Sequence, residues 1–275
     1  MEVKAQYLLY DENCPLCVWY TRLFVKYGFI QNETRISYQK AIASESLSFD
    51  EERAKSEIAL VTEGESTTYG VDSMLKVMAN RWSIVRTIGR FFPIYWMLQV
   101  LYRFISFNRK IIAPTICKDN CSCTPKFHPF WRAMFIVFCG VMTYWLVGNY
   151  FNSALSGYLR NNQFSHEFTL FVAQLLFQTA VFKLLKQHDL YTYLGHISFI
   201  SLLGALALGG SQVVLATMSS FGLETALLAP VILGVVVSLM LIEHIRRVKL
   251  LGLSSWLTVS LLVFRILIYP IVFTL

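Results

Sequence analysis

The stretch that decides the fold of the N-terminal part is Gln6-Tyr7-Leu8-Leu9-Tyr10-Asp11-Glu12-Asn13-Cys14-Pro15-Leu16-Cys17. Its first five residues form a mostly apolar run that predicts a strand. Pro15 is typical of the first helical position, because proline presets φ there and gives up no hydrogen-bond donor that the first turn needs. The helical spacing of apolar residues continues to Tyr27. The stretch therefore predicts a strand, a short turn, and a helix that begins between the two cysteines.

Two cysteines three residues apart on a first helical turn can form a short-loop disulfide. The unpaired N–H groups and the positive dipole end at the start of a helix stabilise a thiolate, so we expect a lowered pKa for Cys14. Cys14 is then the attacking thiolate and Cys17 the resolving thiol. Asp11 is either a base or a residue that tunes Cys14, since its negative charge opposes thiolate formation. Half of a metal site, or two structural thiols, are the alternatives for the pair.

The remainder of the N-terminal part reads as an α/β unit. Strands are expected at residues 35–38, 58–62 and 66–69, and helices at 51–55 and, capped by Asp72 or Ser73, through Met74, Val77 and Met78. Trp19 and Tyr20 lie one helical turn past the cysteines and are expected to belong to the core. The chain shows no phosphate-binding glycine loop and no hydrolase or zinc-protease motif.

Composition separates the second half of the chain from the first. Of 275 residues only 15% are charged, against about a quarter in an ordinary soluble domain. Residues 1–130 hold 16 of the 24 Lys and Arg and 13 of the 17 Asp and Glu. A membrane-spanning helix needs about 20 apolar residues. Five apolar stretches meet this requirement and are predicted as spans near 131–151, 168–186, 192–215, 226–243 and 254–274.

The basic residues that flank these stretches predict an orientation. They gather before the first span, after the second and after the fourth, at Lys110, Lys118, Lys126, Arg132, Lys183, Lys186, Arg246, Arg247 and Lys249. By the positive-inside rule the N-terminus is expected in the cytoplasm and the C-terminus outside. No signal peptide is recognised, so we expect the head to stay in the reducing cytoplasm, at the inner membrane of a bacterium.

A basic, aromatic segment connects the two halves. Residues 1–75 carry a net charge of −5 and residues 76–132 a net charge of +9. Arginines between aromatic residues at 81–103 predict amphipathic helices at the cytoplasmic membrane surface. Beside five spans, anionic lipid explains this charge better than nucleic acid does, and no groove-reading motif is present.

A second group of cysteines precedes the first span, at Cys117, Cys121 and Cys123, followed by His128. Three thiols and an imidazole can supply the tetrahedral ligand set that zinc prefers, and thiolates also suit Cu(I). The same thiols can instead form a resolving disulfide that exchanges with Cys14–Cys17. A third reading is that they are incidental thiols.

Ionisable residues inside apolar spans are costly and often functional. Arg265, His196 and Glu243 lie in or at the ends of predicted spans, and they form either a binding or proton site or structural polar contacts. Cys139 is expected to be a small packing residue. Small residues inside the third span, Gly204, Gly209 and Gly210, suit close helix packing.

Three segments carry a resemblance to a known family. Tyr10-Asp11-x-x-Cys14-Pro15-Leu16-Cys17 resembles the DxxCxxC signature of the DCC family of predicted thiol-disulfide oxidoreductases. Tyr69-Gly70-Val71-Asp72-Ser73 and the segment from Tyr102 to Arg109 are similar to the family's central and closing segments. The resemblance covers residues 1 to about 120. It implies a thioredoxin-like fold with Cys14 and Cys17 as the redox pair.

One departure narrows the expected substrates. Thioredoxin-like enzymes normally dock substrate backbone with a cis-proline beside the cysteines, whereas here Pro15 is the only proline before Pro93. A dedicated partner or a small substrate is therefore expected rather than general protein-disulfide reduction.

The whole sequence predicts a thioredoxin-like α/β domain (residues 1–80), a basic, cysteine-rich connector at the membrane surface (81–130), and an all-α transmembrane bundle of about five helices (131–275). The predicted function is a membrane-anchored thiol-disulfide oxidoreductase. The alternative is a transport or complex-assembly subunit whose head senses redox state or handles a thiol-bound metal. The expected partners are the lipid bilayer and a protein thiol, a protein disulfide or a membrane complex.

Overall fold

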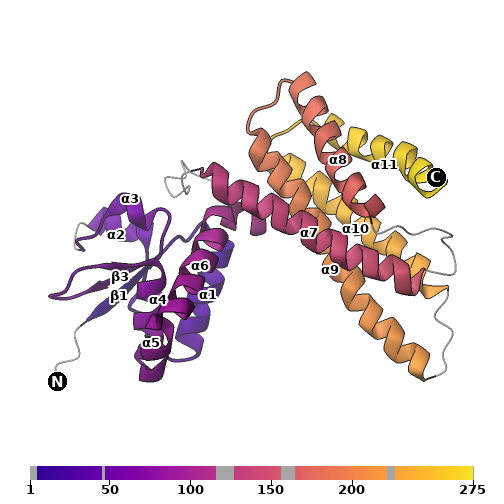
Figure 1. Ribbon diagram of the computed structural model, residues 1–275. Helices are drawn as coiled ribbons and strands as arrows, with labels where there is room; N and C mark the ends of the chain where they lie inside the picture. Colours follow the sequence, from indigo (N-terminus) through magenta and orange to yellow (C-terminus); the bar gives the residue numbers. More distant parts are fainter. Residues whose placement is uncertain (1–4, 45–46, 116–126, 156–164, 222–226, 275) are drawn as a thin grey trace. The chain divides into compact units, whose positions relative to one another are not determined.

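The computed structural model describes residues 5–44, 47–115, 127–155, 165–221 and 227–274. The chain divides into two compact units, residues 1–131 and 132–275. The N-terminal unit combines a small sheet with helices, and the described part of the second unit is helical (Figure 1). The prediction of an α/β part followed by a helical part is confirmed at this level.

The sheet of the N-terminal unit has the strand order β2-β1-β3-β4. Its strands are β1 (Gln6–Tyr10), β2 (Arg35–Ser37), β3 (Ala59–Thr62) and β4 (Thr68–Tyr69). β1 pairs in parallel with β2, which requires the crossover that α1 (Pro15–Lys26) supplies. β3 is antiparallel to both β1 and β4, and all four of its residues are buried. The strands predicted at 6–10, 35–38, 58–62 and 66–69 therefore exist, with small shifts at their ends.

Both faces of this sheet are covered, because successive side chains of a strand point to opposite sides. Leu8 packs with the α1 side chain of Phe24 and with Val77 of α4 (Gly70–Ala79). Leu9 packs on the other face with Tyr38, the first residue of α2 (Tyr38–Ser44). The short α3 (Glu51–Ala54) contributes Ala54 to the same face as Tyr38.

The predicted cap of the helix after β4 is wrong. α4 begins at Gly70, and the residue before it, Tyr69, makes no side-chain cap. Gly70 has φ +60°, a backbone conformation that residues with a Cβ rarely adopt. A Cβ there would also lie 3.2 Å from Glu57 Oε2. Chain direction at this turn therefore depends on glycine rather than on a capping oxygen.

Two further helices complete the N-terminal unit. They are α5 (Ser83–Arg90) and α6 (Phe92–Ile112), separated by the extended residue Phe91. Pro93 lies in the first turn of α6, where its missing N–H costs nothing. The C-terminal half of α6 buries Asn108, Arg109 and Ile111.

The helices of the second part are α7 (Pro129–Ala154), α8 (Ser165–Leu184), α9 (Leu190–Ser220), α10 (Leu228–Leu250) and α11 (Trp256–Thr274). Within the described residues, α7, α9 and α10 are long and apolar enough to cross a membrane. The apolar parts of α8 and α11 are shorter, at Phe168–Leu184 and Trp256–Ile268. Three of the five predicted spans are therefore supported by length and composition, and the other two stay predictions.

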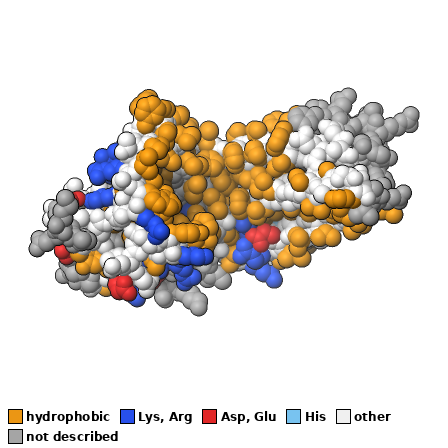
Figure 2. Space-filling model, turned by 90° about the horizontal axis from the view of Figure 1, so that it is seen from below, with side chains coloured by type: hydrophobic (Ala, Val, Ile, Leu, Met, Phe, Trp, Pro, Cys, Tyr) orange, Lys and Arg blue, Asp and Glu red, His pale blue; other side chains and the backbone are white. Residues whose placement is uncertain are grey.

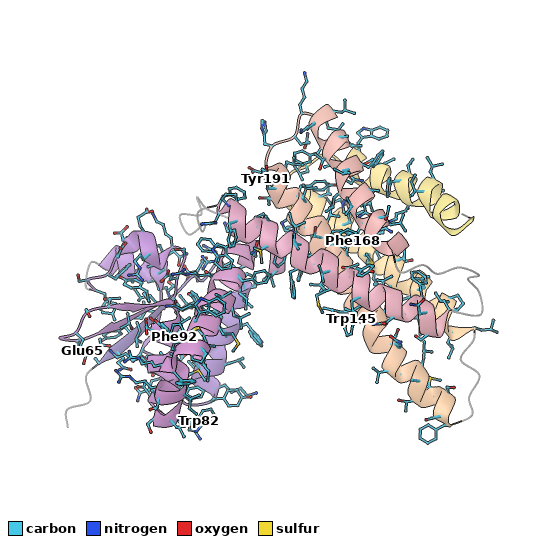
Figure 3. The ribbon with its side chains drawn as sticks, viewed as in Figure 1. Glu65, Trp82, Phe92, Trp145, Phe168 and Tyr191 are labelled. Atoms are coloured by element: carbon cyan, nitrogen blue, oxygen red, sulfur yellow. The ribbon has the colours of Figure 1, made fainter. Side chains whose placement is uncertain are left out.

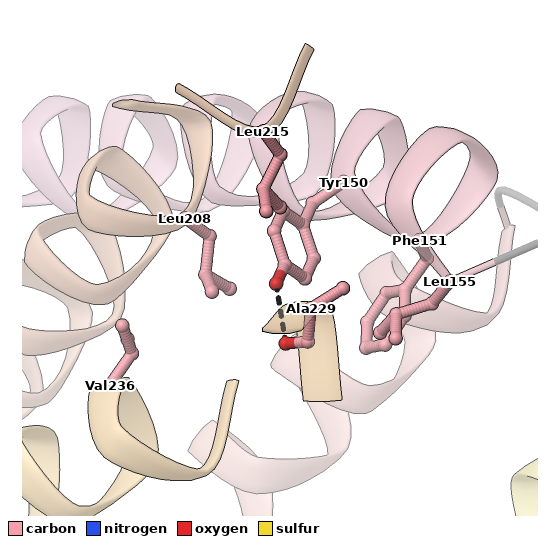
Figure 4. Packing of buried hydrophobic residues seen from close by; sticks show 7 residues of the cluster. All are labelled: Tyr150, Phe151, Leu155, Leu208, Leu215, Ala229 and Val236. Carbon is pink, nitrogen blue, oxygen red and sulfur yellow. Dashed lines mark hydrogen bonds between the residues drawn. The ribbon is translucent and has the colours of Figure 1, made fainter. Parts of the chain in front are cut away.

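Helices α7, α9 and α10 share a buried apolar cluster (Figure 4). Tyr150 of α7 is fully buried in it and donates a 2.7 Å hydrogen bond to the carbonyl of Ala229 on α10. Glycines allow close approach nearby, because a Cβ on Gly204 of α9 would collide with Met240 of α10. Gly209 of α9 similarly faces Leu146, whereas Gly210 has nothing within 4 Å. The predicted packing role holds for the first two glycines only.

Outward-facing side chains of these helices are largely apolar. Trp145 on α7 and Phe168 on α8 are 53% and 47% exposed (Figure 3). Hydrophobic side chains cover much of the surface in view, with Lys and Arg gathered in patches (Figure 2). A surface of this kind is compatible with a lipid bilayer.

Candidate functional site

The turn between β1 and α1 holds Cys14 at the start of the helix. Cys14 is the N-cap of α1, and its Sγ accepts a 3.3 Å hydrogen bond from the backbone N–H of Cys17. Asp11 shapes the turn, since its carbonyl accepts from the Cys14 N–H at 3.2 Å and its Oδ1 accepts from the Asn13 N–H at 3.0 Å. A sulfur atom thus takes the place that an oxygen of Ser or Asp usually takes at a helix N-cap.

Cys14 and Cys17 are both free thiols, 6% and 4% exposed. A hydrogen bond from the Cys17 thiol, together with the charge of Arg109 and the Cys17 N–H, lowers the pKa of Cys14 from 9.0 to about 7, against the opposing effect of burial. The hydrogen bond to Cys14 and burial raise the pKa of Cys17 far above its ordinary value. Cys14 is therefore the thiol that ionises around neutral pH, and Cys17 keeps its proton.

Asp11 is held by a buried arginine from α6. Arg109 Nη2 lies 3.2 Å from Asp11 Oδ2, and both side chains are 6% exposed. The same Nη2 donates a 2.7 Å hydrogen bond to the Lys55 carbonyl. Burial alone would lower the pKa of Arg109, but its nearness to the acidic groups of Cys17, Cys14 and Asp11 raises it. Arg109 thus brings a permanent positive charge to the dithiol and offsets the carboxylate beside it.

One side of α6 also holds the loop that precedes β3. The hydroxyl of Tyr102 accepts a 2.9 Å hydrogen bond from the Ile58 N–H. One turn later, Ser106 donates from its hydroxyl to the carbonyl of Ser56. Tyr102, Ser106 and Arg109 follow the spacing that places side chains on one helix face. This face fixes the backbone of residues 55–58 against the cysteine turn.

Arg109 and Tyr102 are site residues that no motif in the sequence indicates. Arg109 lies 98 positions from Asp11 along the chain, so no local pattern links them. The available signal was the similarity of the segment Tyr102–Arg109 to the closing family segment, because that segment begins and ends on these two residues.

The aromatic pair after the cysteines divides between surface and interior. Trp19 is 60% exposed, so the expectation that it belongs to the core is wrong. Tyr20 is half-buried and packs with Phe24. Burial first, then its nearness to the acidic group of Cys17 and a hydrogen bond with that residue, raise the pKa of Tyr20 well above its ordinary value. A protonated hydroxyl therefore stands beside the resolving sulfur.

The predicted metal cluster is only partly within the described residues. Cys117, Cys121 and Cys123 lie outside them, and His128 is exposed, with its ring 5.3 Å from that of Phe107. Among the residues that the structure describes, no group of three potential ligands is found. A zinc or Cu(I) site at this cluster stays a prediction.

The structure brings His196 and Glu243 together through an arginine that was expected in a loop. α10 continues to Leu250, so Arg247 lies on a helix, 3% exposed. Its Nη1 lies 2.8 Å from His196 Nδ1, and its Nε donates to Glu243 Oε1 at 2.7 Å. Arg265, the arginine named from the sequence, is half-buried on α11. Cys139 is fully buried, as a packing residue would be.

A second buried polar group joins four helices. Tyr193 of α9 donates a 2.9 Å hydrogen bond to Gln178 Oε1 of α8, and its hydroxyl lies 3.4 Å from His244 Nε2 of α10. His244 Nδ1 lies 3.0 Å from the hydroxyl of Thr258 on α11. Gln178, Tyr193 and His244 are each at most 2% exposed. The helices are therefore joined by directional polar contacts as well as by apolar packing.

Comparison with known proteins finds a similarity within the N-terminal unit. No curated protein and no solved structure matches the chain. Residues 8–113 match the model of the family described as DCC1-like thiol-disulfide oxidoreductase. The match includes the cysteine turn, the sheet and α6 with Tyr102 and Arg109. The part of the chain that carries Cys14, Cys17 and Arg109 is therefore similar to the DCC1-like thiol-disulfide oxidoreductase family.

Proposed function

We propose that the protein is a membrane-anchored thiol-disulfide oxidoreductase with a thioredoxin-like head. The observation that carries the proposal is the position of Cys14, whose sulfur caps α1 beside the Cys17 thiol and near the charge of Arg109. These contacts favour a nucleophilic thiolate at neutral pH. The mixed sheet, with β1 and β2 joined in parallel through α1, supports the thioredoxin-like assignment.

The reaction follows from the protonation of the two thiols. The Cys14 thiolate attacks one sulfur of a substrate disulfide, forms a mixed disulfide and releases the other substrate sulfur as a thiolate. Cys17 then gives up its proton to that leaving thiolate and attacks the Cys14 sulfur. The Cys14–Cys17 disulfide forms, the second substrate sulfur leaves as a thiolate that takes a proton from water, and two electrons have passed from the head to the substrate. A dithiol donor restores the head by the reverse steps.

The surroundings of the loop before β3 favour a dedicated substrate. In this head the Ile58 N–H is already bonded to the Tyr102 hydroxyl. Because this N–H already has an acceptor, it is not available to pair with the backbone of a peptide substrate. Trp19 of α1 is exposed and is a candidate contact for such a substrate.

The proposed location is the cytoplasmic membrane of a bacterium, with the head in the cytoplasm and the C-terminus outside. The apolar helices α7, α9 and α10 support insertion in a bilayer. The alternation of basic clusters between predicted spans supports the orientation. A reducing cytoplasm would keep Cys14 and Cys17 as the dithiol between turnovers.

The test is a redox titration of the purified, full-length protein across glutathione ratios, read by thiol mass labelling. We expect Cys14 and Cys17 to titrate together as one two-electron couple near the thioredoxin range of about −270 mV. The Cys17→Ala variant should trap a mixed disulfide on Cys14, and Cys14→Ser should trap none. Independent oxidation of the two thiols, or turnover by Cys14→Ser at the normal rate, would refute the proposal. Metal analysis of the same sample tests Cys117, Cys121, Cys123 and His128.

A second candidate function is a transport or assembly subunit, favoured by the contacts of His196, Arg247 and Glu243 within apolar helices. Such groups are costly in a membrane and often line a functional path. The discriminating variant is Arg247→Leu. Loss of a cellular function with an unchanged Cys14–Cys17 couple would favour this candidate.

A further inference from the structure

Helices α5 and α6, the last two helices before α7, expose an unusual amount of apolar surface. Nine large apolar side chains between residues 82 and 105 are 37% to 79% exposed. We call them the α5–α6 stripe: Trp82, Ile84, Ile88, Phe91, Phe92, Trp96, Met97, Leu101 and Ile105. The side chains of Trp82 and Phe92 mark the starts of the two helices in Figure 3. An exposed apolar area of this extent marks an interaction surface.

The stripe lies on the side of α6 that faces away from the redox site. Tyr102, Ser106 and Arg109 hold the head with one face of α6. Met97 and Leu101, a helical turn apart, are 55% and 50% exposed on the other. Packing within the head therefore explains only one of the two faces of this helix.

Charge distinguishes a lipid surface from an ordinary protein partner. The stripe is flanked by the exposed side chains of Arg81, Arg86, Arg90 and Arg103. No acidic residue occurs between Asp72 and Asp119. Arg90 lies 3.9 Å from Asp72, so one acidic side chain also borders the stripe. Apolar side chains flanked mainly by arginines are the pattern of a helix that lies in the headgroup region of an anionic membrane.

Chain connectivity brings this surface to the bilayer. α6 ends at Ile112, and α7, the first candidate span, begins at Pro129. The connecting residues reach at most about 60 Å when fully extended, so the stripe cannot leave the vicinity of the membrane. Its local lipid concentration is high, and a modest affinity suffices for binding.

We propose that the α5–α6 stripe binds the surface of the anionic leaflet, with its apolar side chains among the headgroups and its arginines on lipid phosphates. The head is then held by two attachments, the α5–α6 stripe and the helices that follow. This inference goes beyond the redox function and does not depend on it, since it rests on exposure, charge and connectivity.

The experiment uses the full chain in vesicles, with a nitroxide attached to a keto amino acid at position 97 so that all native cysteines remain. Vesicles contain phosphatidylcholine with or without phosphatidylglycerol. We expect the label in anionic vesicles to collide often with oxygen and rarely with a water-soluble nickel complex. A label at Glu65, an exposed position near β4, should show the reverse.

A matched pair of charge reversals tests the electrostatic part. Arg103→Glu should lower the ratio of oxygen collisions to nickel collisions of the label at position 97 several-fold in anionic vesicles. Lys40→Glu, the same change on α2 at the opposite face of the sheet, should leave it unchanged. Frequent collisions of the label at position 97 with the nickel complex in anionic vesicles would overturn the proposal. Shielding from both reagents also overturns it, because the stripe is then covered by protein, either another part of the chain or a second copy.

Discussion

Asp11 and Arg109 form a buried ion pair, 3.2 Å between Oδ2 and Nη2, across 98 positions of the chain. The pair joins the turn that carries Cys14 to the last turns of α6. Removing one member of a buried pair leaves an uncompensated charge, which is more costly than never having had the pair. Both residues therefore matter for stability, whereas their charges act on Cys14 in opposite directions.

Arg109→Gln removes the positive charge next to the dithiol. We expect the pKa of Cys14 to rise above about 7, because that charge favours the thiolate. We also expect the free energy of unfolding of the head to fall by about 3–5 kcal/mol, since Asp11 loses its partner. The measurements are the pH dependence of alkylation by iodoacetamide and denaturation in urea. An unchanged alkylation midpoint would show that Arg109 does not act on the thiolate.

Asp11→Asn has the opposite effect on the thiol. The carboxylate raises the pKa of Cys14, so its removal should lower that pKa further. Stability should still fall, because Arg109 remains buried with one acceptor fewer. The double variant Asp11→Asn/Arg109→Gln closes a cycle from which the coupling energy is obtained. A pKa that moves in the same direction in both single variants would contradict this description of the site.

The pH dependence of reactivity follows from the depressed pKa of Cys14. Its alkylation rate should rise with pH around a midpoint of about 7 and level off below the ordinary value of 9.0. The folded, reduced protein should also gain stability as pH rises from about 7 to 9, where Cys14 is ionised only in the folded state. The gain is lost as pH falls through about 7. Cys14→Ser is the control, and the same gain in that variant would rule out Cys14 as its source.

Tyr102→Phe should change the stability of the head without changing the reactivity of Cys14. The change leaves the Ile58 N–H without its acceptor, which costs about 1–3 kcal/mol for a buried donor. Because Arg109 keeps its contacts with Asp11 and Lys55, the alkylation midpoint of Cys14 should stay near its wild-type value. Tyr95→Phe, which removes a 2.9 Å hydrogen bond to Asp72, provides a comparison on the same helix. A large shift of the midpoint in Tyr102→Phe would mean that the loop before β3 tunes the thiol.

Patterns in the sequence identify those parts of the head whose structure depends on interactions between residues that are close in the chain. β1 and the start of α1 were predicted because apolar runs, Pro15 and the cysteine spacing act over a few residues. The cap at Asp72 or Ser73 was wrong because the helix starts at a glycine with positive φ. Arg109 was missed because its role is set by tertiary contacts. In the second unit, Arg247 was expected in a loop but lies on α10. Hydropathy alone determines the end of a helix poorly.

The hydrogen bonds among Gln178, Tyr193, His244 and Thr258 have a consequence for biogenesis. These residues come from α8, α9, α10 and α11, in the order of synthesis. The polar groups of the first three helices reach their full set of partners only when the last helix has left the ribosome and joined them. Until then some of these polar groups lack the partners that they have in the complete bundle. Assembly of the bundle is therefore completed from its C-terminal end, and a chain truncated before α11 would leave His244 without its contact to Thr258.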